Sequence, residues 1–203
     1  TISSIKRDMG TANNVTIIAP GGEYNGQKFD QVTFDAKFGA DNAKIEYFYG
    51  YDENKNEILK TEAPENAGTY IVRITIPETD NYSGLVGEVT LIITKKAFNV
   101  SGLDFTAIDK IYNGTSQYWS INPDGNKETD DAEVRLIVSD ESLLQNIIFA
   151  GMKHPTECMH VGTYEILAVL QISNPNYTFI ETYVEVENGE EVTKTREVDE
   201  YEL

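Results

Sequence analysis

The two histidines of the chain are the first residues to consider for chemistry, because an acid and the only cysteine lie between them. His154, Glu157, Cys158 and His160 share one short segment. Zinc proteases place two histidines four residues apart on one helical face, but these lie further apart and Pro155 disfavours a helix. A single cysteine excludes an intrachain disulfide and a zinc site built from several thiolates. The segment is typical of loop histidines, and we predict no enzymatic activity.

Alternating oxygen-bearing side chains indicate a second kind of site. Calcium prefers carboxylate and amide oxygens as ligands, and four residues of one such segment are candidate metal ligands: Asp124, Asn126, Glu128 and Asp130. A shorter run begins at Asp52, but Glu57 and Ala63 stand where an EF-hand loop requires Gly and Glu. Calcium is therefore the one cofactor considered, and solvated loops without any cofactor are the alternative.

Adjacent aromatic side chains are the candidates for ligand binding. Tyr118 and Trp119, the only tryptophan, could stack on a sugar ring or a partner surface. In a strand they would point to opposite faces, so one of them would be part of the core. The alternating Tyr47, Tyr49 and Tyr51 share one face of a predicted strand, which favours a role in the core.

The charge balance narrows the range of partners. The chain has 16 Lys and Arg against 34 Asp and Glu, a net charge of −18. Such a surface repels nucleic acids and anionic lipids, and the sequence contains no apolar run long enough to cross a bilayer. We expect a monomer that neither binds nucleic acid nor inserts into membranes.

Short motifs recur in the same order in both halves of the chain. Tyr24-Asn25-Gly26 matches Tyr112-Asn113-Gly114, Gly68-Thr69-Tyr70 matches Gly162-Thr163-Tyr164, and Asn81-Tyr82 matches Asn176-Tyr177. Asn and Gly tolerate positive φ, so the first motif predicts a turn. The second motif predicts the start of a strand, followed in each half by a returning strand that closes a hairpin.

The Gly-Thr-Tyr motif also resembles a tyrosine corner, in which the hydroxyl bonds back to nearby backbone. Four residues are therefore predicted to have structural roles: Gly68, Tyr70, Gly162 and Tyr164. Beyond Tyr70, apolar residues alternate with polar ones up to Ile76, as in a half-buried strand.

These patterns predict an all-β protein of two tandem Ig-like β-sandwich domains. Residues 1–13 form a leader or linker, residues 14–97 the first domain, and residues 98–203 the second. The alternative is a pair of β-grasp-like domains, which would need a helix crossing the sheet. The one helical signal is a short stretch from Ser139 to Asn146. The acidic tail from residue 187 is either a hairpin around Asn188-Gly189 or a linker.

Two bacterial families share these motifs. The first half resembles the MBG family in Gly22-Glu23-Tyr24-Asn25-Gly26, in residues 63–70 and in Leu91-Ile92-Ile93-Thr94-Lys95. The second half resembles the YDG family in Val100-Ser101-Gly102-Leu103, in residues 109–115 and in residues 161–164. Asn113 stands where the name of that family implies Asp, and either residue suits the turn.

The resemblance implies repeated modules of long bacterial proteins that are secreted or attached to the cell wall. It implies no activity and no set of functional residues. We expect a non-catalytic structural spacer, with neighbouring domains of the same parent chain as partners. The alternative is an adhesive module that binds a host glycan, mucin or protein. The sequence places neither a ligand nor a Lys–Asn isopeptide crosslink.

Overall fold

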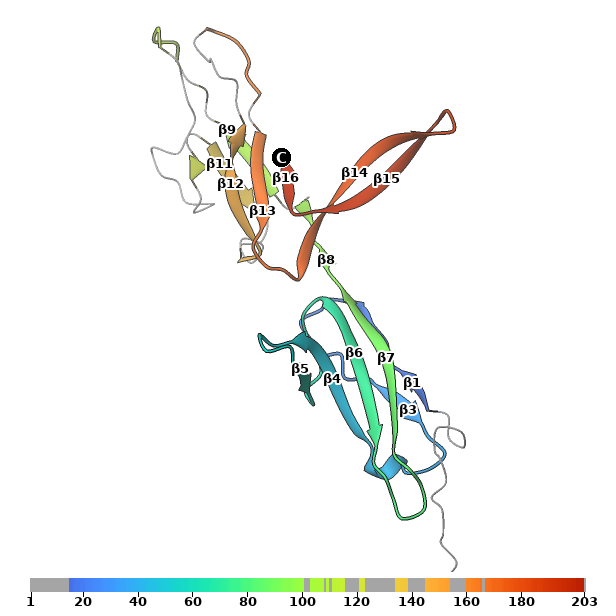
Figure 1. Cartoon of the computed structure of the whole chain (residues 1–203). Coiled ribbons are helices and arrows are strands. Elements are labelled where there is room, and N and C mark those ends of the chain that lie inside the picture. Colours follow the sequence, from blue (N-terminus) through green and yellow to red (C-terminus); the bar gives the residue numbers. More distant parts are fainter. Residues whose placement is uncertain are drawn as a thin grey trace, which may run out of the picture. The chain divides into compact units, whose positions relative to one another are not determined.

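The computed structural model describes residues 15–100, 103–107, 109, 111–115, 121–122, 134–138, 145–153, 160–165 and 167–202. The chain divides into two compact units, residues 1–96 and residues 97–203. Each unit consists of strands drawn as arrows in Figure 1. The described residues contain no α-helix, and η1 (Ala40–Asn42) is a short 3-10 helix of the first unit. They include no helix long and apolar enough to cross a membrane.

The first unit is built on a five-stranded sheet in the order β2-β7-β6-β4-β5. These strands are β2 (Gly22–Glu23), β4 (Lys44–Tyr51), β5 (Glu57–Lys60), β6 (Gly68–Ile76) and β7 (Leu85–Thr94). All neighbours run antiparallel except β2 and β7, which are parallel. A second, two-stranded sheet pairs β1 (Thr16–Ile18) with β3 (Thr33–Asp35).

The core of the first unit lies between these two sheets. Alternate residues of β6 are almost inaccessible to solvent, namely Val72, Ile74 and Ile76. Ile17 of β1 and Phe34 of β3 pack against this cluster from the small sheet. The alternation along β6 therefore places its apolar face in a sandwich-like core, as the period-2 pattern predicts.

Strand β4 departs from the simple alternation in the sequence. Tyr47 is buried and Tyr49 half-buried, but Tyr51 is 64% exposed. A bulge shifts the register between Phe48 and Tyr51, and Gly50 adopts a φ of 120°. Tyr51 then contacts Phe48, with ring centroids 5.1 Å apart. Placing Tyr51 on the core face was therefore wrong, because an extra residue in a bulge re-aims the side chains that follow it.

The described part of the second unit contains three sheets of three strands each. Their orders are β10-β11-β9, β12-β13-β16 and β15-β14-β8. The strands are β8 (Lys96–Ala97), β9 (Leu103–Ala107), β10 (Ile121–Asn122), β11 (Val134–Val138), β12 (Ile147–Lys153), β13 (Leu167–Ile172), β14 (Tyr177–Glu187), β15 (Glu190–Val198) and β16 (Glu200–Glu202).

Phe179 lies at the centre of the core of the second unit and is fully buried. Its ring is 5.6 Å from that of Phe98 and 5.5 Å from that of Tyr201. Leu170 of β13 and Ile147 of β12 complete the cluster. Residues from both ends of the unit therefore meet around one aromatic side chain, and such rings supply much of the buried area of a core.

The predicted closing hairpin exists in the first unit but not in the second. In the first unit β6 and β7 pair along their length, from Gly68 opposite Ile93 to Ile76 opposite Leu85. In the second unit β14 pairs with β15 and β8, whereas β13 pairs with β12 and β16. The position beside β13 is thus held by β16, whose Tyr201 joins the core.

The start of the predicted strand also differs between the units. Gly68 is the first residue of β6, but β13 begins only at Leu167, after the corresponding motif. Ala168 and Leu170 are buried as the alternation predicts. Most of the stretch from Ser139 to Asn146, which carries the helical signal, lies outside the described residues.

The acidic tail forms a hairpin rather than a linker. Strands β14 and β15 pair from Phe179 opposite Val198 to Glu187 opposite Glu190. Asn188 and Gly189 form the two-residue turn with φ of 53° and 88°, and positive φ at both positions is what a type I′ hairpin turn requires. Figure 1 shows this hairpin extending away from the β12-β13-β16 sheet of its own unit.

Candidate functional site

Most residues that the sequence offers for chemistry cannot be placed. Six candidates for metal or ligand binding lie outside the described residues: Tyr118, Trp119, Asp124, Asn126, Glu128 and Asp130. The same holds for His154, Glu157 and Cys158. Across the described ranges, no three His, Cys, Asp or Glu side chains gather into a group that could hold a metal ion.

Asp52 lies in the described part of the chain, and its carboxylate serves the turn between β4 and β5. One oxygen accepts hydrogen bonds from the backbone N–H groups of Asn54 and Asn56, both at 2.8 Å. The other accepts one from the Asn56 amide at 3.1 Å. The backbone and side-chain hydrogen bonds of Asn56 lower the pKa of Asp52. The alternating Asp and Asn residues of this loop thus form a turn whose carboxylate is already hydrogen-bonded.

Both Gly-Thr-Tyr motifs form a tyrosine hydrogen bond to the backbone four residues upstream. The hydroxyl of Tyr70 donates to the carbonyl oxygen of Asn66 at 2.9 Å. The hydroxyl of Tyr164 donates to the backbone carbonyl oxygen of His160 at 2.5 Å and accepts from the backbone N–H of His160 at 3.2 Å. Burial raises the pKa of Tyr70, which keeps the hydroxyl protonated as a donor. This is the geometry of a tyrosine corner.

The two glycines before these tyrosines differ in how closely the ring approaches them. A Cβ added at Gly68 would lie 3.2 Å from the hydroxyl oxygen of Tyr70 and 3.3 Å from two of its ring carbons. A Cβ at Gly162 would lie 4.0 Å from the nearest atom of Tyr164. Only in the first unit, therefore, does the corner depend on glycine for space.

The parallel pair of β2 and β7 joins an early strand of the first unit to β7, which ends at Thr94. Gly22 and Glu23 lie opposite Ile93 and Thr94, and the Tyr24 N–H donates to the Thr94 carbonyl at 2.9 Å. A Cβ added at Gly21 would lie 2.2 Å from the carbonyl oxygen of Ile92, a backbone atom. A residue with a side chain would fit at Gly21 only if one of the two backbone segments moved away.

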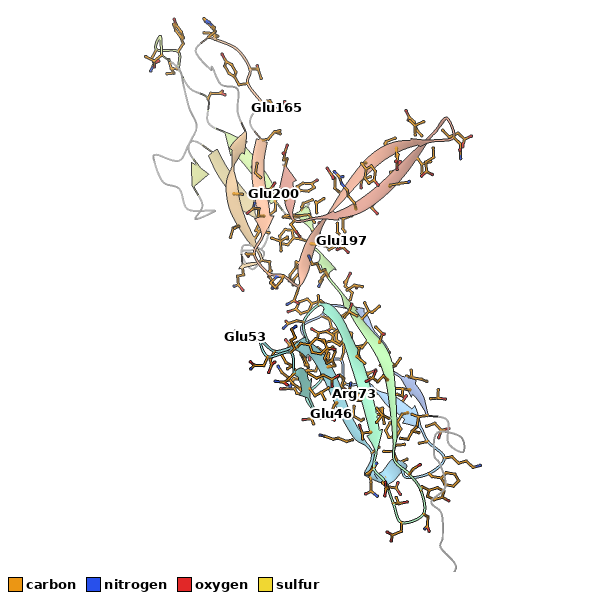
Figure 2. The ribbon with its side chains drawn as sticks, in the orientation of Figure 1. Glu46, Glu53, Arg73, Glu165, Glu197 and Glu200 are labelled. Carbon is orange, nitrogen blue, oxygen red and sulfur yellow. The ribbon has the colours of Figure 1, made fainter. Side chains whose placement is uncertain are left out.

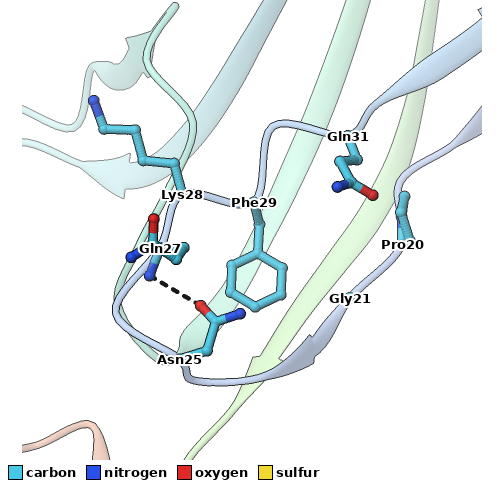
Figure 3. Close-up of a pocket in the computed structure, with 7 residues that line it drawn as sticks. All are labelled: Pro20, Gly21, Asn25, Gln27, Lys28, Phe29 and Gln31. Atoms are coloured by element: carbon cyan, nitrogen blue, oxygen red, sulfur yellow. Dashed lines mark hydrogen bonds between the residues drawn. The ribbon is translucent and has the colours of Figure 1, made fainter.

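A groove opens beside this junction. Its volume is about 350 Å³, and it is lined by Pro20, Gly21, Asn25, Gln27, Lys28, Phe29 and Gln31. Figure 3 shows Gln27 and Gln31 on either side of the Phe29 ring. Phe29 is half-buried: it packs against the core cluster and also lines the groove.

Some polar side chains of the groove form hydrogen bonds or ion pairs within the protein, and others do not. The side chain of Asn25 accepts from the Gln27 N–H at 2.9 Å, and Lys28 forms an ion pair with Glu62. Within the described residues, the side-chain amides of Gln27 and Gln31 have no hydrogen-bond partner. Two amides able to donate and accept therefore flank an aromatic ring, a combination suited to a small polar ligand with an apolar face.

The face of the five-stranded sheet opposite the core carries a charged cluster. Arg73 donates to Glu57 at 2.6 and 3.1 Å and to Glu88 at 2.6 Å. Glu46 lies opposite Arg73 in the strand register, and Figure 2 shows both residues on this sheet. Hydrogen bonding to Arg73 lowers the pKa of Glu57. Arg73 therefore forms ion pairs with Glu57 and Glu88, which lie on other strands of the sheet.

Sequence reasoning did not identify the groove. Gly21, Phe29 and the two glutamines precede or follow the turn motif at Asn25-Gly26 without forming a pattern of their own. The pair Gly21-Gly22 was the available signal, because adjacent glycines before a strand often mark a close approach of two backbones.

Comparison with known protein families finds a match in the first part of the chain. Residues 13–97 match the family of the MBG domain. This range contains residues 13–96 of the first unit and ends at Ala97, the first residue of the second. No curated protein and no solved structure matches the chain significantly.

The two tyrosine corners generate a paired prediction. Gly68→Ala is expected to destabilise the first unit by about 1–3 kcal/mol, because the Tyr70 ring must shift to admit the new Cβ. Gly162→Ala is expected to change the stability of the second unit by less than about 0.5 kcal/mol. Hydrogen exchange followed residue by residue measures each unit separately. Equal losses in the two units would contradict this account.

The Asp52 turn generates a prediction about pH. Because the pKa of Asp52 is lowered in the folded protein, its contribution to stability is present above the unfolded value of about 3.8 and is lost as the pH falls through the folded value. Asp52→Asn should therefore flatten the acid dependence of the stability of the first unit, measured from amide signals during acid titration. Glu53→Gln removes a charge from the same turn and should leave that dependence unchanged.

Proposed function

We propose that this chain is a non-catalytic structural module of a bacterial cell-surface or secreted protein, located outside the cell. The match of residues 13–97 to the MBG domain supports this setting. The acidic charge of −18 supports a soluble spacer that binds neither nucleic acid nor membrane and stays monomeric through self-repulsion. Its partners would be neighbouring domains of the same parent chain.

We further propose that residues 98–203 form a domain of the YDG family. Two features of the second unit support this assignment. Asn113 and Gly114 form a turn in which Gly114 has a φ of 83°, and the Thr115 N–H donates to the Asn113 side chain at 3.0 Å. Tyr164 makes the corner described above. The first unit has the corresponding turn at Asn25 and the corresponding corner at Tyr70.

The parallel β2–β7 pair is the observation that carries the spacer proposal. Strand β7 ends at Thr94, and only Lys95 separates it from β8. Tension applied to the chain beyond Lys95 would therefore act on the end of β7. A pull on the N-terminal side of β2 and the C-terminal side of β7 slides parallel neighbours past each other. All hydrogen bonds of the pair then resist together, whereas peeling would break them one at a time. A domain closed in this way suits a load-bearing spacer.

A pulling experiment tests this role. Gly21→Ala should lower the stability of the first unit by about 1–3 kcal/mol, since the added methyl group overlaps the Ile92 carbonyl. It should also lower the force at which the first unit unfolds when the chain is stretched between handle domains. Gly162→Ala is the matched control and should leave that force unchanged. A first unit that unfolds at the same force with and without Gly21 would refute the load-bearing pair.

The groove beside β2 favours a second candidate function, adhesion to a host glycan, mucin or protein. Stacking on Phe29 together with hydrogen bonds from Gln27 and Gln31 would suit a neutral sugar, whose ring has an apolar face and hydroxyl groups at its edge. Tyr118 and Trp119 remain the candidates for this function in the second half. The spacer and adhesive roles do not exclude each other, because a groove at one junction leaves the strand pairing intact.

Titration with galactose, N-acetylgalactosamine, N-acetylglucosamine and intact mucin tests adhesion. If the groove binds, amide signals of residues 20–31 should shift, and the double variant Gln27→Ala/Gln31→Ala should lose the response. A response that survives this variant but is lost in Trp119→Ala would move the site to the second half. No response at millimolar sugar and no retention on mucin would exclude the adhesive function.

A further inference from the structure

The chain contains three Asn-Gly steps in exposed turns, and their side-chain surroundings differ. They are Asn25-Gly26, Asn113-Gly114 and Asn188-Gly189. We propose that Asn113 is a site of spontaneous backbone modification, at which the side chain closes on the Gly114 nitrogen to form a succinimide. The arrangement of the turn around Asn113 favours this reaction over the same reaction at the other two steps.

The nucleophile of this reaction is the peptide nitrogen of Gly114. A virtual Cβ on Gly114 meets no atom within 4 Å, so no neighbouring group crowds the α-carbon of this residue. In the part of the chain that the structure describes, the Gly114 N–H donates to no acceptor. Absence of a Cβ also lets Gly114 rotate through conformations closed to other residues. The nitrogen is therefore able to reach the neighbouring side-chain carbonyl.

The electrophile is the side-chain carbonyl carbon of Asn113, and two donors polarise its oxygen. The Thr115 N–H donates to Oδ1 at 3.0 Å, and the Thr115 hydroxyl donates to the same atom at 2.7 Å. Nucleophilic attack turns this oxygen into an oxyanion. Donors already aimed at the position where negative charge develops lower the barrier of such a step. Asn113, Gly114 and Thr115 are all exposed, so water reaches the product.

The reaction needs only water as a co-reactant. Base removes the proton from the Gly114 nitrogen, which forms a bond to the Asn113 side-chain carbonyl carbon. The tetrahedral intermediate breaks its bond to the side-chain nitrogen, which leaves as ammonia after taking up a proton. Water then adds to either carbonyl of the succinimide ring and reopens it. The products are aspartate or isoaspartate, and the second has one more methylene group in the main chain.

The other two Asn-Gly steps provide controls within the same molecule. The Asn25 oxygen accepts one hydrogen bond, from the Gln27 N–H at 2.9 Å. The Asn188 oxygen accepts none among the described residues, and Asn188 is held at a φ of 53° in the β14–β15 turn. Two donors, one donor and none thus predict the order of reaction: Asn113 first, then Asn25, then Asn188.

Modification would change the charge and the backbone of an exposed turn in the second unit. Each event replaces a neutral amide with a carboxylate, which adds to a net charge that is already −18. In the isoaspartate product the longer main chain cannot keep the short Asx hydrogen bond to Thr115. Because ammonia is lost in the reaction, the proportion of molecules modified at this turn would increase with the age of the protein.

Peptide mass spectrometry after timed incubation of the full chain tests the proposal. The folded protein is kept in mildly alkaline buffer made with heavy-oxygen water, and the three Asn-Gly peptides are followed separately. We expect label and isoaspartate to appear at Asn113 about three- to tenfold faster than at Asn25, the range expected from one additional exposed hydrogen bond. Asn188 should be the slowest of the three.

Substitutions of Thr115 separate the hydroxyl from the rest of the turn. Thr115→Val keeps the shape and should slow the reaction at Asn113 to about the rate at Asn25, since one donor of the usual net value is lost. Thr115→Ser keeps the hydroxyl and should keep the rate. Rates at Asn25 and Asn188 should not change in either variant.

Rates measured in the unfolded chain distinguish the effect of the folded structure on the reaction from the effect of the neighbouring residues in the sequence. In concentrated denaturant the three rates should approach one another, because the hydrogen bonds to Asn113 are gone. The proposal is wrong if Asn113 reacts no faster than Asn25 in the folded protein, or if Thr115→Val has no effect. It is also wrong if the same order of rates persists in denaturant.

Discussion

Two backbone segments of the first unit approach each other closely where Gly21 passes the carbonyl of Ile92. Even one methyl group on Gly21 would lie 2.2 Å from that oxygen, so the contact between β2 and β7 depends on a residue without a side chain. The segment after β2 turns at Asn25-Gly26, and Phe29 packs back against the core. The pairing of β2 with β7 depends on this approach, and Gly21 also lines the groove.

The strand pairing of the second unit differs from that of the first, because β13 pairs with β16 and not with the next strand in the chain. Its β14 leaves β13 after a polar turn in which the N–H of Ser173 donates to the carbonyl of Asn146 at 2.9 Å. The chain then makes a long hairpin and returns as β16 to the place beside β13. Pairing β14 with β15 closes only a two-residue turn, which costs little chain entropy, and the return of β16 brings Tyr201 to Phe179.

Both units share small devices of local structure even though their strand orders differ. Each has an Asn side chain that caps its own turn and a tyrosine that bonds back four residues along the chain. Such devices hold loops in place and do not require a ligand. They fit the proposed role of a structural module, and at Asn113 the same turn geometry also favours chemistry on the backbone itself.

Local features of both units could be predicted from the sequence because they depend on neighbouring residues. The turns at Asn-Gly, the buried face of Val72, Ile74 and Ile76 and the all-β class follow from positive φ and from alternation with a period of two. The position of Tyr51 and the partner of β14 could not be predicted. A bulge at Gly50 and the choice among competing strands are set by contacts between residues distant in sequence. The groove likewise could not be predicted, because it depends on how the tertiary structure folds residues 20–31 around Phe29, and no pattern of residue types records that arrangement.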